Sequence, residues 1–155
     1  MAQTNFQDWI GLFGRTAEDP AVKALLRSAG VTKKLVMPRD EQDLLVDIPG
    51  MTVNFQDAEL FEDLPPVGSG NCVLTGVVLR LEKDKASTYT GPLPCDIKRD
   101  SSQADLRARF GKPSESESDI GWDRWVIADN LTLTAQYTGD RASIEALMLS
   151  QPEPD

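Results

Sequence analysis

The side chains that could do chemistry in this 155-residue chain are mainly carboxylates, because the sequence has no histidine and two cysteines. Without histidine it lacks the commonest general base near neutral pH and the usual activator of a serine or cysteine nucleophile. Cys72 belongs to an apolar stretch and Cys95 lies between Pro94 and Asp96, so neither has the positive surroundings that favour a thiolate. Two isolated cysteines also do not make a zinc site. We predict two reduced thiols, with a single disulfide between them as the alternative.

Carboxylates alone can catalyse glycoside hydrolysis, which requires two acids. Such enzymes usually have a concave site lined with aromatic rings, and only 6% of these residues are aromatic. The alternating acids at 115–119 lack the glycine turn and the terminal bidentate acid of a calcium loop. The glycines at 68 and 70 lack the lysine of a phosphate loop. We predict no catalytic residue, cofactor or metal site, with an enzyme that uses carboxylates alone as an alternative.

The acidic residues are unevenly distributed along the chain. The formal net charge is −9, and the segment from Pro38 to Pro66 contains eight acids and one base. An acidic surface repels nucleic acid and anionic membranes but attracts a basic protein. We therefore predict a protein partner, and neither nucleic acid nor membrane. The alternative is that these acids form a solvated face that keeps the protein soluble.

Two acidic segments are the candidate partner-binding sites. In the first, apolar side chains lie among the acids and could anchor a partner inside a charged rim. The alternative is that Phe61 belongs to the core and the acids solvate a loop. The first site consists of Asp57, Glu59, Phe61, Glu62 and Asp63, and the second of Glu115, Glu117 and Asp119.

The elements that position these residues begin with two short helices. Phe6, Trp9, Ile10 and Phe13 follow the i, i+3, i+4, i+7 spacing of one helical face, and Thr4 is a candidate cap. The second predicted helix begins after Asp19 and ends at Gly30, as expected from an N-cap followed by proline and a terminal glycine. A third helix is predicted between Ser102 and Gly111.

The remaining pattern predicts strands. Period-two alternation indicates strands at 34–37, 43–48 and 51–56, and apolar residues on both faces of 71–83 indicate a central strand. Residues 114–119 are predicted to form a polar loop. A hairpin of 125–128 and 131–137, followed by a strand at 143–149, predicts a C-terminal β-meander.

These elements predict an α+β fold with two N-terminal helices, one mid-chain helix and a mainly antiparallel sheet. The length is that of one domain, which we place at residues 1–150, followed by a disordered tail at 151–155. The first residues do not form a basic region followed by an apolar run, and no stretch of about 18 apolar residues occurs, so we expect a cytoplasmic protein.

The second half resembles small immunity proteins encoded beside bacterial polymorphic toxins, such as effectors of type VI secretion or contact-dependent inhibition. The residues that carry this resemblance are Tyr89-x-Gly91-Pro92-Leu93-Pro94, Ser102-x-x-Asp105-Leu106-Arg107-x-Arg109-Phe110-Gly111-Lys112-Pro113, Trp125, Tyr137 and Ile144-x-x-Leu147-x-Leu149. The helix followed by a meander also looks like the small domain of outer-membrane-assembly lipoproteins and of β-lactamase-inhibitor-like folds.

The resemblance to immunity proteins implies a function. Such proteins are non-catalytic and cytoplasmic, and they neutralise a cognate toxin by covering its active site or a neighbouring surface. For a basic nuclease toxin, a carboxylate-rich face would imitate phosphates and speed the encounter. The alternative function is a structural or chaperone-like adaptor for a secreted protein, which would bind without blocking activity.

Overall fold

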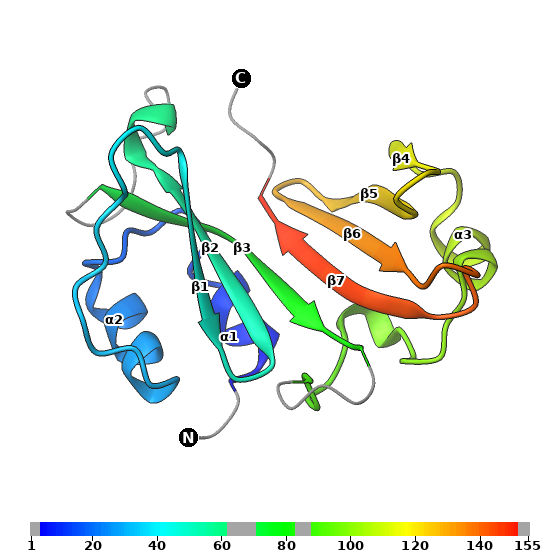
Figure 1. Ribbon diagram of the computed structural model, residues 1–155, viewed down its shortest axis with the longest axis horizontal. Coiled ribbons are helices and arrows are strands. Elements are labelled where there is room, and N and C mark those ends of the chain that lie inside the picture. Colours follow the sequence, from blue (N-terminus) through cyan, green and yellow to red (C-terminus); the bar gives the residue numbers. More distant parts are fainter. Residues whose placement is uncertain (1–3, 62–70, 83–87, 152–155) are drawn as a thin grey trace.

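The computed structural model describes residues 4–61, 71–82 and 88–151. Within them, seven antiparallel strands form one sheet in the order β1-β2-β3-β7-β6-β5-β4 (Figure 1). The strands are β1 Asp43–Ile48, β2 Met51–Asp57, β3 Cys72–Arg80, β4 Glu115–Glu117, β5 Trp122–Ala128, β6 Leu131–Tyr137 and β7 Ile144–Ser150. The predicted α+β class and antiparallel sheet are confirmed.

Two meanders, β1–β2–β3 and β5–β6–β7, join where β3 pairs with β7. This pairing covers only Gly76–Arg80 and Ala146–Ser150. The first half of β3 has a different neighbour on that side. The Ala17 amide donates to the Cys72 carbonyl at 2.8 Å, and the Leu74 amide donates to the Arg15 carbonyl at 2.8 Å. β3 therefore pairs with a near-N-terminal segment over one half and with the last strand over the other.

The helices are α1 Phe6–Ile10, α2 Pro20–Ser28 and α3 Gln103–Phe110, with 3-10 turns η1 Ala58–Phe61 and η2 Pro94–Asp96. α1 is shorter than its apolar spacing predicts, and its N-cap is Asn5 rather than Thr4. The Thr4 hydroxyl instead accepts a hydrogen bond from Trp9 Nε1 at 2.8 Å. The caps predicted for the other two helices, Asp19 and Ser102, are confirmed.

Two predictions about local structure are wrong. Residues 34–37 do not form a strand, although Leu35 and Met37 are buried and Val36 is 60% exposed. The alternation there reflects an extended segment packed on the core without a strand neighbour among the described residues. Residues 114–119 are not entirely loop, because Glu115–Glu117 form β4 against β5. A charged edge strand has no apolar alternation by which to recognise it.

Most of the core lies on one side of the sheet, although both faces of β3 are buried over its first six residues. The helices contribute Trp9 and Val22, which are fully buried, and Leu106, which is 2% exposed. These side chains form one hydrophobic cluster with strand residues such as Val53 and Leu133. Figure 1 shows α1 behind the β1–β3 part of the sheet. No helix among the described residues is long and apolar enough to cross a membrane.

Candidate functional site

The sheet face opposite the core is the candidate functional surface, and we call it the open face. Alternation along the strands assigns side chains to it: in β5, Asp123 and Trp125 are buried against the helices, whereas Arg124 and Val126 lie on the other side. In β2, Val53 is buried while Asn54 lies on the open face. An exposed sheet face of this size could accommodate a macromolecular partner.

One row of directly paired residues crosses six strands of the open face, and we call it the cross-strand row. It consists of Leu45, Asn54, Gly76, Ser150, Thr132 and Val126. With about 4.8 Å between neighbouring strands, the row spans roughly 24 Å. Its two ends are apolar and exposed, Leu45 by 64% and Val126 by 63%, whereas its middle consists of small or polar residues.

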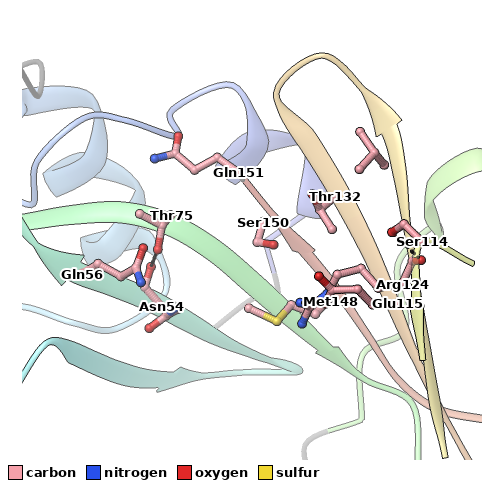
Figure 2. Close-up of a pocket in the computed structure, with 11 residues that line it drawn as sticks. Asn54, Gln56, Thr75, Ser114, Glu115, Arg124, Thr132, Met148, Ser150 and Gln151 are labelled. Carbon is pink, nitrogen blue, oxygen red and sulfur yellow. Dashed lines mark hydrogen bonds and ion pairs between the residues drawn. The ribbon is translucent and has the colours of Figure 1, made fainter. Parts of the chain in front are cut away.

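A shallow depression of about 260 Å³ lies over this row from Asn54 to Val126 and leaves out Leu45, and we call it the central hollow. Figure 2 shows Asn54 and Gln56 on one side of it and Arg124 and Glu115 on the other. Gly76 lies in the row between the lining residues Asn54 and Ser150. A Cβ atom at Gly76 would approach the Leu149 carbonyl oxygen at 3.2 Å, so the close pairing of β3 and β7 favours glycine there.

The charged side chains beside the hollow form one ordered cluster. Arg124 Nη1 lies 2.9 Å from Glu115 Oε2, and Arg124 Nε donates to Thr134 Oγ1 at 3.0 Å. The guanidinium also lies over the Trp122 ring, 5.0 Å from its centroid. The positive charge of Arg124 is thus compensated within the open face, and its side chain is held in one orientation.

A second arginine is held in the same way near the opposite edge of the sheet. Arg80 Nη1 lies 3.3 Å from Asp47 Oδ1 and donates to Thr52 Oγ1 at 2.6 Å, while Nη2 donates to the Ile48 carbonyl at 2.7 Å. By contrast, the carboxylates Asp43, Glu117 and Glu145 form no ion pair with any residue in the described part of the chain. The open face therefore has a net negative charge.

A buried carboxylate lies on the helix-covered side. Asp123 is fully buried and accepts hydrogen bonds from Arg107 at 2.8 and 2.9 Å, from the Tyr137 hydroxyl at 2.9 Å and from Gln103 Nε2 at 3.4 Å. Burial alone would raise the pKa of Asp123, but these donors outweigh it and hold the pKa below its usual value. The carboxylate is fully engaged, so its role is to fix α3 to the sheet.

The first predicted binding site is only partly accessible. The Asp57 carboxylate accepts the Glu59 amide at 3.0 Å and so initiates η1, while the Glu59 side chain is exposed. Phe61 is 7% exposed, in agreement with the alternative that its ring belongs to the core. Glu62 and Asp63, like the glycines at 68 and 70, lie outside the described residues. Partner binding by the acids of this segment stays a prediction.

The second predicted site lies on the other half of the sheet. Glu115 lines the central hollow, Glu117 is in β4, and Asp119 follows in the turn with its amide bonded to Glu117 Oε1 at 3.1 Å. The first predicted site begins directly after Gln56, which lines the same hollow as Glu115, but Asp57, Glu59 and Phe61 do not line it. Partner binding by these residues also stays a prediction.

Sequence reasoning missed the uncharged members of the central hollow. Asn54, Thr132 and Ser150 come from three different strands, and only the pairing register places them in one row. A partial signal was available, because Thr52, Asn54 and Gln56 alternate with buried apolar residues in β2. That alternation indicates that one face of β2 is polar, but it does not indicate which residues of other strands lie beside that face.

Metal and thiol chemistry have little support in the described residues. Within the described ranges, no group of three or more histidine, cysteine, aspartate or glutamate side chains is arranged to hold a metal ion. Both cysteines are free. Burial, and then the nearby Asp57 carboxylate, raise the pKa of the Cys72 thiol, which disfavours its reactive thiolate. Cys95 is exposed.

The chain was compared with protein-family models, with curated proteins and with solved structures. None of the three comparisons gives a match.

Proposed function

We propose that this chain is a non-catalytic binding protein that docks a basic protein on its open face and neutralises it. The observation that carries this proposal is the cross-strand row, whose exposed ends, Leu45 and Val126, flank a polar centre on a sheet face that none of the described helices α1, α2 and α3 covers. A partner that covers the open face would bury both side chains, and burial of their apolar surface would favour binding.

The arrangement of the row fits a protein partner better than a small molecule. Its roughly 24 Å length matches the dimensions of a protein–protein contact of standard size, in which a few apolar anchors lie within a polar surround. The hollow, at about 260 Å³, is smaller than the roughly 300–1,000 Å³ typical of pockets for drug-sized ligands. We infer that the surface as a whole, rather than the hollow alone, forms the contact.

Charge favours a basic partner. The two arginines of the open face are paired with acids beside them, which leaves Asp43, Glu117 and Glu145 as uncompensated carboxylates. The whole chain also carries a formal charge of −9. Long-range attraction of this kind raises the association rate, while the apolar contacts determine how slowly the complex dissociates.

The resemblance of residues 89–149 to toxin-immunity proteins suggests the kind of partner. An immunity protein binds one toxin molecule and prevents its activity, which requires a stable surface and no catalytic group. An open sheet face with ordered charged side chains suits that role, because little conformational freedom is lost on binding. If the partner were bound but stayed active, the chain would instead be a structural or chaperone-like adaptor.

The test uses the product of the gene adjacent to the one for this chain. We expect that product to inhibit growth when expressed alone, and co-expression of this chain to restore growth. We also expect Leu45→Arg and Val126→Arg each to weaken binding at least roughly tenfold, because each places a cation at an apolar anchor facing a basic partner. Affinity is measured by calorimetry with the purified proteins.

Val36→Arg is the matched control, because Val36 is 60% exposed but lies outside the open face. It should bind and protect like the unmodified protein. Equal weakening by all three substitutions would indicate a non-specific charge effect and contradict docking on the open face. An adjacent product that is not toxic, or that does not bind, would contradict the toxin-neutralising role.

The electrostatic part has its own test. Neutralising the open-face acids with Asp43→Asn, Glu117→Gln and Glu145→Gln should slow association, and added salt should slow association of the unmodified protein. The comparison variant is Asp57→Asn with Glu59→Gln, in the acidic segment at the end of β2. A larger effect of the comparison variant would assign steering to that segment instead of the open face.

A further inference from the structure

We propose, as an inference that rests on the function proposed above, that the central hollow binds an uncharged stretch of the partner's polypeptide main chain. The hollow lies along the cross-strand row from Asn54 to Val126, which itself lines the hollow, and the exposed Leu45 is one strand beyond its other end. A partner that contacts both ends of the row must also cover this depression. The chemistry of its lining therefore decides what part of the partner lies there.

The lining contains hydrogen-bonding groups that the protein itself does not use. Asn54 Oδ1 is buried and has no hydrogen-bond partner among the described residues. Within the same described part of the chain, the side chains of Gln56, Thr132, Ser150 and Gln151 make no hydrogen bond, although all of them line the hollow. A buried acceptor without a partner destabilises the free protein. Its presence beside four more unengaged polar side chains points to a ligand that supplies hydrogen bonds.

The hollow favours an uncharged ligand. Its ionised lining residues are Arg124 and Glu115, and they form an ion pair with each other at 2.9 Å. Arg124 is further engaged by Thr134 and stacks over Trp122. A phosphate, a carboxylate or an ammonium group would have to break this cluster or stay uncompensated, whereas a neutral polar group need not.

Among neutral groups, the lining matches a peptide main chain best. A carboxamide carries both a donor and an acceptor, as does a peptide group, so each can form two complementary hydrogen bonds with the other. Asn54 and Gln56 are two residues apart on β2, or about 7 Å, which is also the repeat of alternate residues in an extended peptide. A sugar ring would need an aromatic face, and Trp122 is covered by the Arg124 guanidinium.

The first experiment substitutes the buried acceptor. Asn54→Leu has nearly the same size and removes the unsatisfied oxygen, so we expect its melting temperature to equal or exceed that of the unmodified protein. We expect its affinity for the product of the adjacent gene to fall roughly tenfold or more. Gln7→Leu is the control, because Gln7 is exposed on α1 and lies outside the open face, and it should leave the affinity unchanged.

Ser150→Ala provides a second variant from a different strand, in case Asn54→Leu does not fold. It removes one hydroxyl from the hollow and should lower the affinity by several-fold without lowering the melting temperature. Unchanged affinity in the folded hollow variants, while Leu45→Arg abolishes binding, would overturn the proposal for the hollow. The proposed docking on the open face would then still hold.

The second experiment does not need the partner. N-acetylglycine N-methylamide, glucose and inorganic phosphate are titrated separately into the ¹⁵N-labelled protein. We expect only the peptide mimic to shift the backbone amide signals of residues 54–56, 132 and 150–151, and Asn54→Leu to reduce that shift. Shifts with glucose or phosphate instead, or no shift with any of the three compounds, would contradict main-chain binding at the hollow.

Discussion

Arg107 and Asp123 form a two-point ion pair that joins α3 to β5. Arg107 Nε donates to Asp123 Oδ2 at 2.9 Å and Nη2 to Oδ1 at 2.8 Å. The carboxylate side chain is fully buried, whereas the arginine side chain is 46% exposed. The Tyr137 hydroxyl completes the set from β6 at 2.9 Å. One buried charge thus connects three elements, and its loss should affect the whole of the second meander.

We expect Arg107→Ala to lower the free energy of unfolding by roughly 2–3 kcal/mol. Removing one member of a fully buried pair costs about 3–5 kcal/mol, and the value here is smaller because water can reach the solvent side of Arg107. Urea unfolding monitored by circular dichroism measures the change. Arg109→Ala on the same helix is the control, since Arg109 is exposed over the Phe110 ring and should cost below about 1 kcal/mol. Equal losses in both variants would contradict a special role for the Arg107 pair.

Stability should decrease at acid pH through Asp123. Its pKa in the folded protein is below that of the unfolded chain, because the hydrogen bonds from Arg107, Tyr137 and Gln103 outweigh the effect of burial. The stabilisation is therefore complete above about pH 4, the usual pKa of an aspartate. It is lost as the pH falls through the folded-state pKa.

Melting temperatures between pH 2 and pH 7 test this dependence. Hydrogen bonds also lower the pKa values of Asp105 and Asp140, so some acid sensitivity will persist in any variant. We expect Asp123→Asn to be less stable at pH 7 and to lose less stability than the unmodified protein on acidification. Parallel curves for the two proteins would show that Asp123 does not contribute to the acid transition.

Trp125 should be a major core contact. It is 4% exposed, its Nε1 donates to the Gly111 carbonyl at 3.0 Å, and its ring lies 5.4 Å from that of Phe110. We expect Trp125→Ala to destabilise the protein by roughly 3–5 kcal/mol, measured by urea unfolding. The neighbouring substitution Val126→Ala, on the open face, should change stability by less than about 0.5 kcal/mol. A reversed order of the two effects would mean that the two faces of β5 are interchanged.

The two thiols should differ in reactivity. Cys95 is exposed, whereas Cys72 is 1% exposed and burial raises the pKa of its thiol. With Ellman's reagent at pH 8, we expect one thiol to react rapidly and the second only after unfolding in urea. Cys95→Ser should remove the rapid phase, and Cys72→Ser should leave it intact. Two rapid thiols in the native protein would contradict the burial of Cys72.

The elements that could be predicted are those with a local cause. The alternating apolar residues of β6, from Leu131 to Tyr137, identify a hairpin strand from a few neighbours, and the side chains of Asp19 and Ser102 determine where two helices begin. The pairing of β3 with β7 joins residues about 70 positions apart. No local pattern specifies that contact, because many apolar strands could supply the backbone hydrogen bonds that β3 forms on that side.

The candidate site depends on such distant contacts, which explains why its centre was missed. Asn54, Ser150 and Thr132 each have an ordinary environment in their own strands, and they become one surface only through three successive pairings. Charge, by contrast, is visible in the sequence, and it directed attention to Glu115 and to the segment around Asp57. Glu115 lines the hollow, whereas Asp57 does not, although its neighbour Gln56 does.

Because β3 pairs with two different segments along one side, loss of either segment would expose part of its backbone. The segment at 14–17 forms hydrogen bonds with the Cys72 carbonyl and with the amide and carbonyl of Leu74, which β7 leaves uncovered. Those groups belong to the buried part of β3. If the segment at 14–17 detached, unpaired backbone groups at the start of β3 would be exposed, and a second copy could pair one of its own strands with them. The early residues therefore guard against self-association as well as contributing to the core.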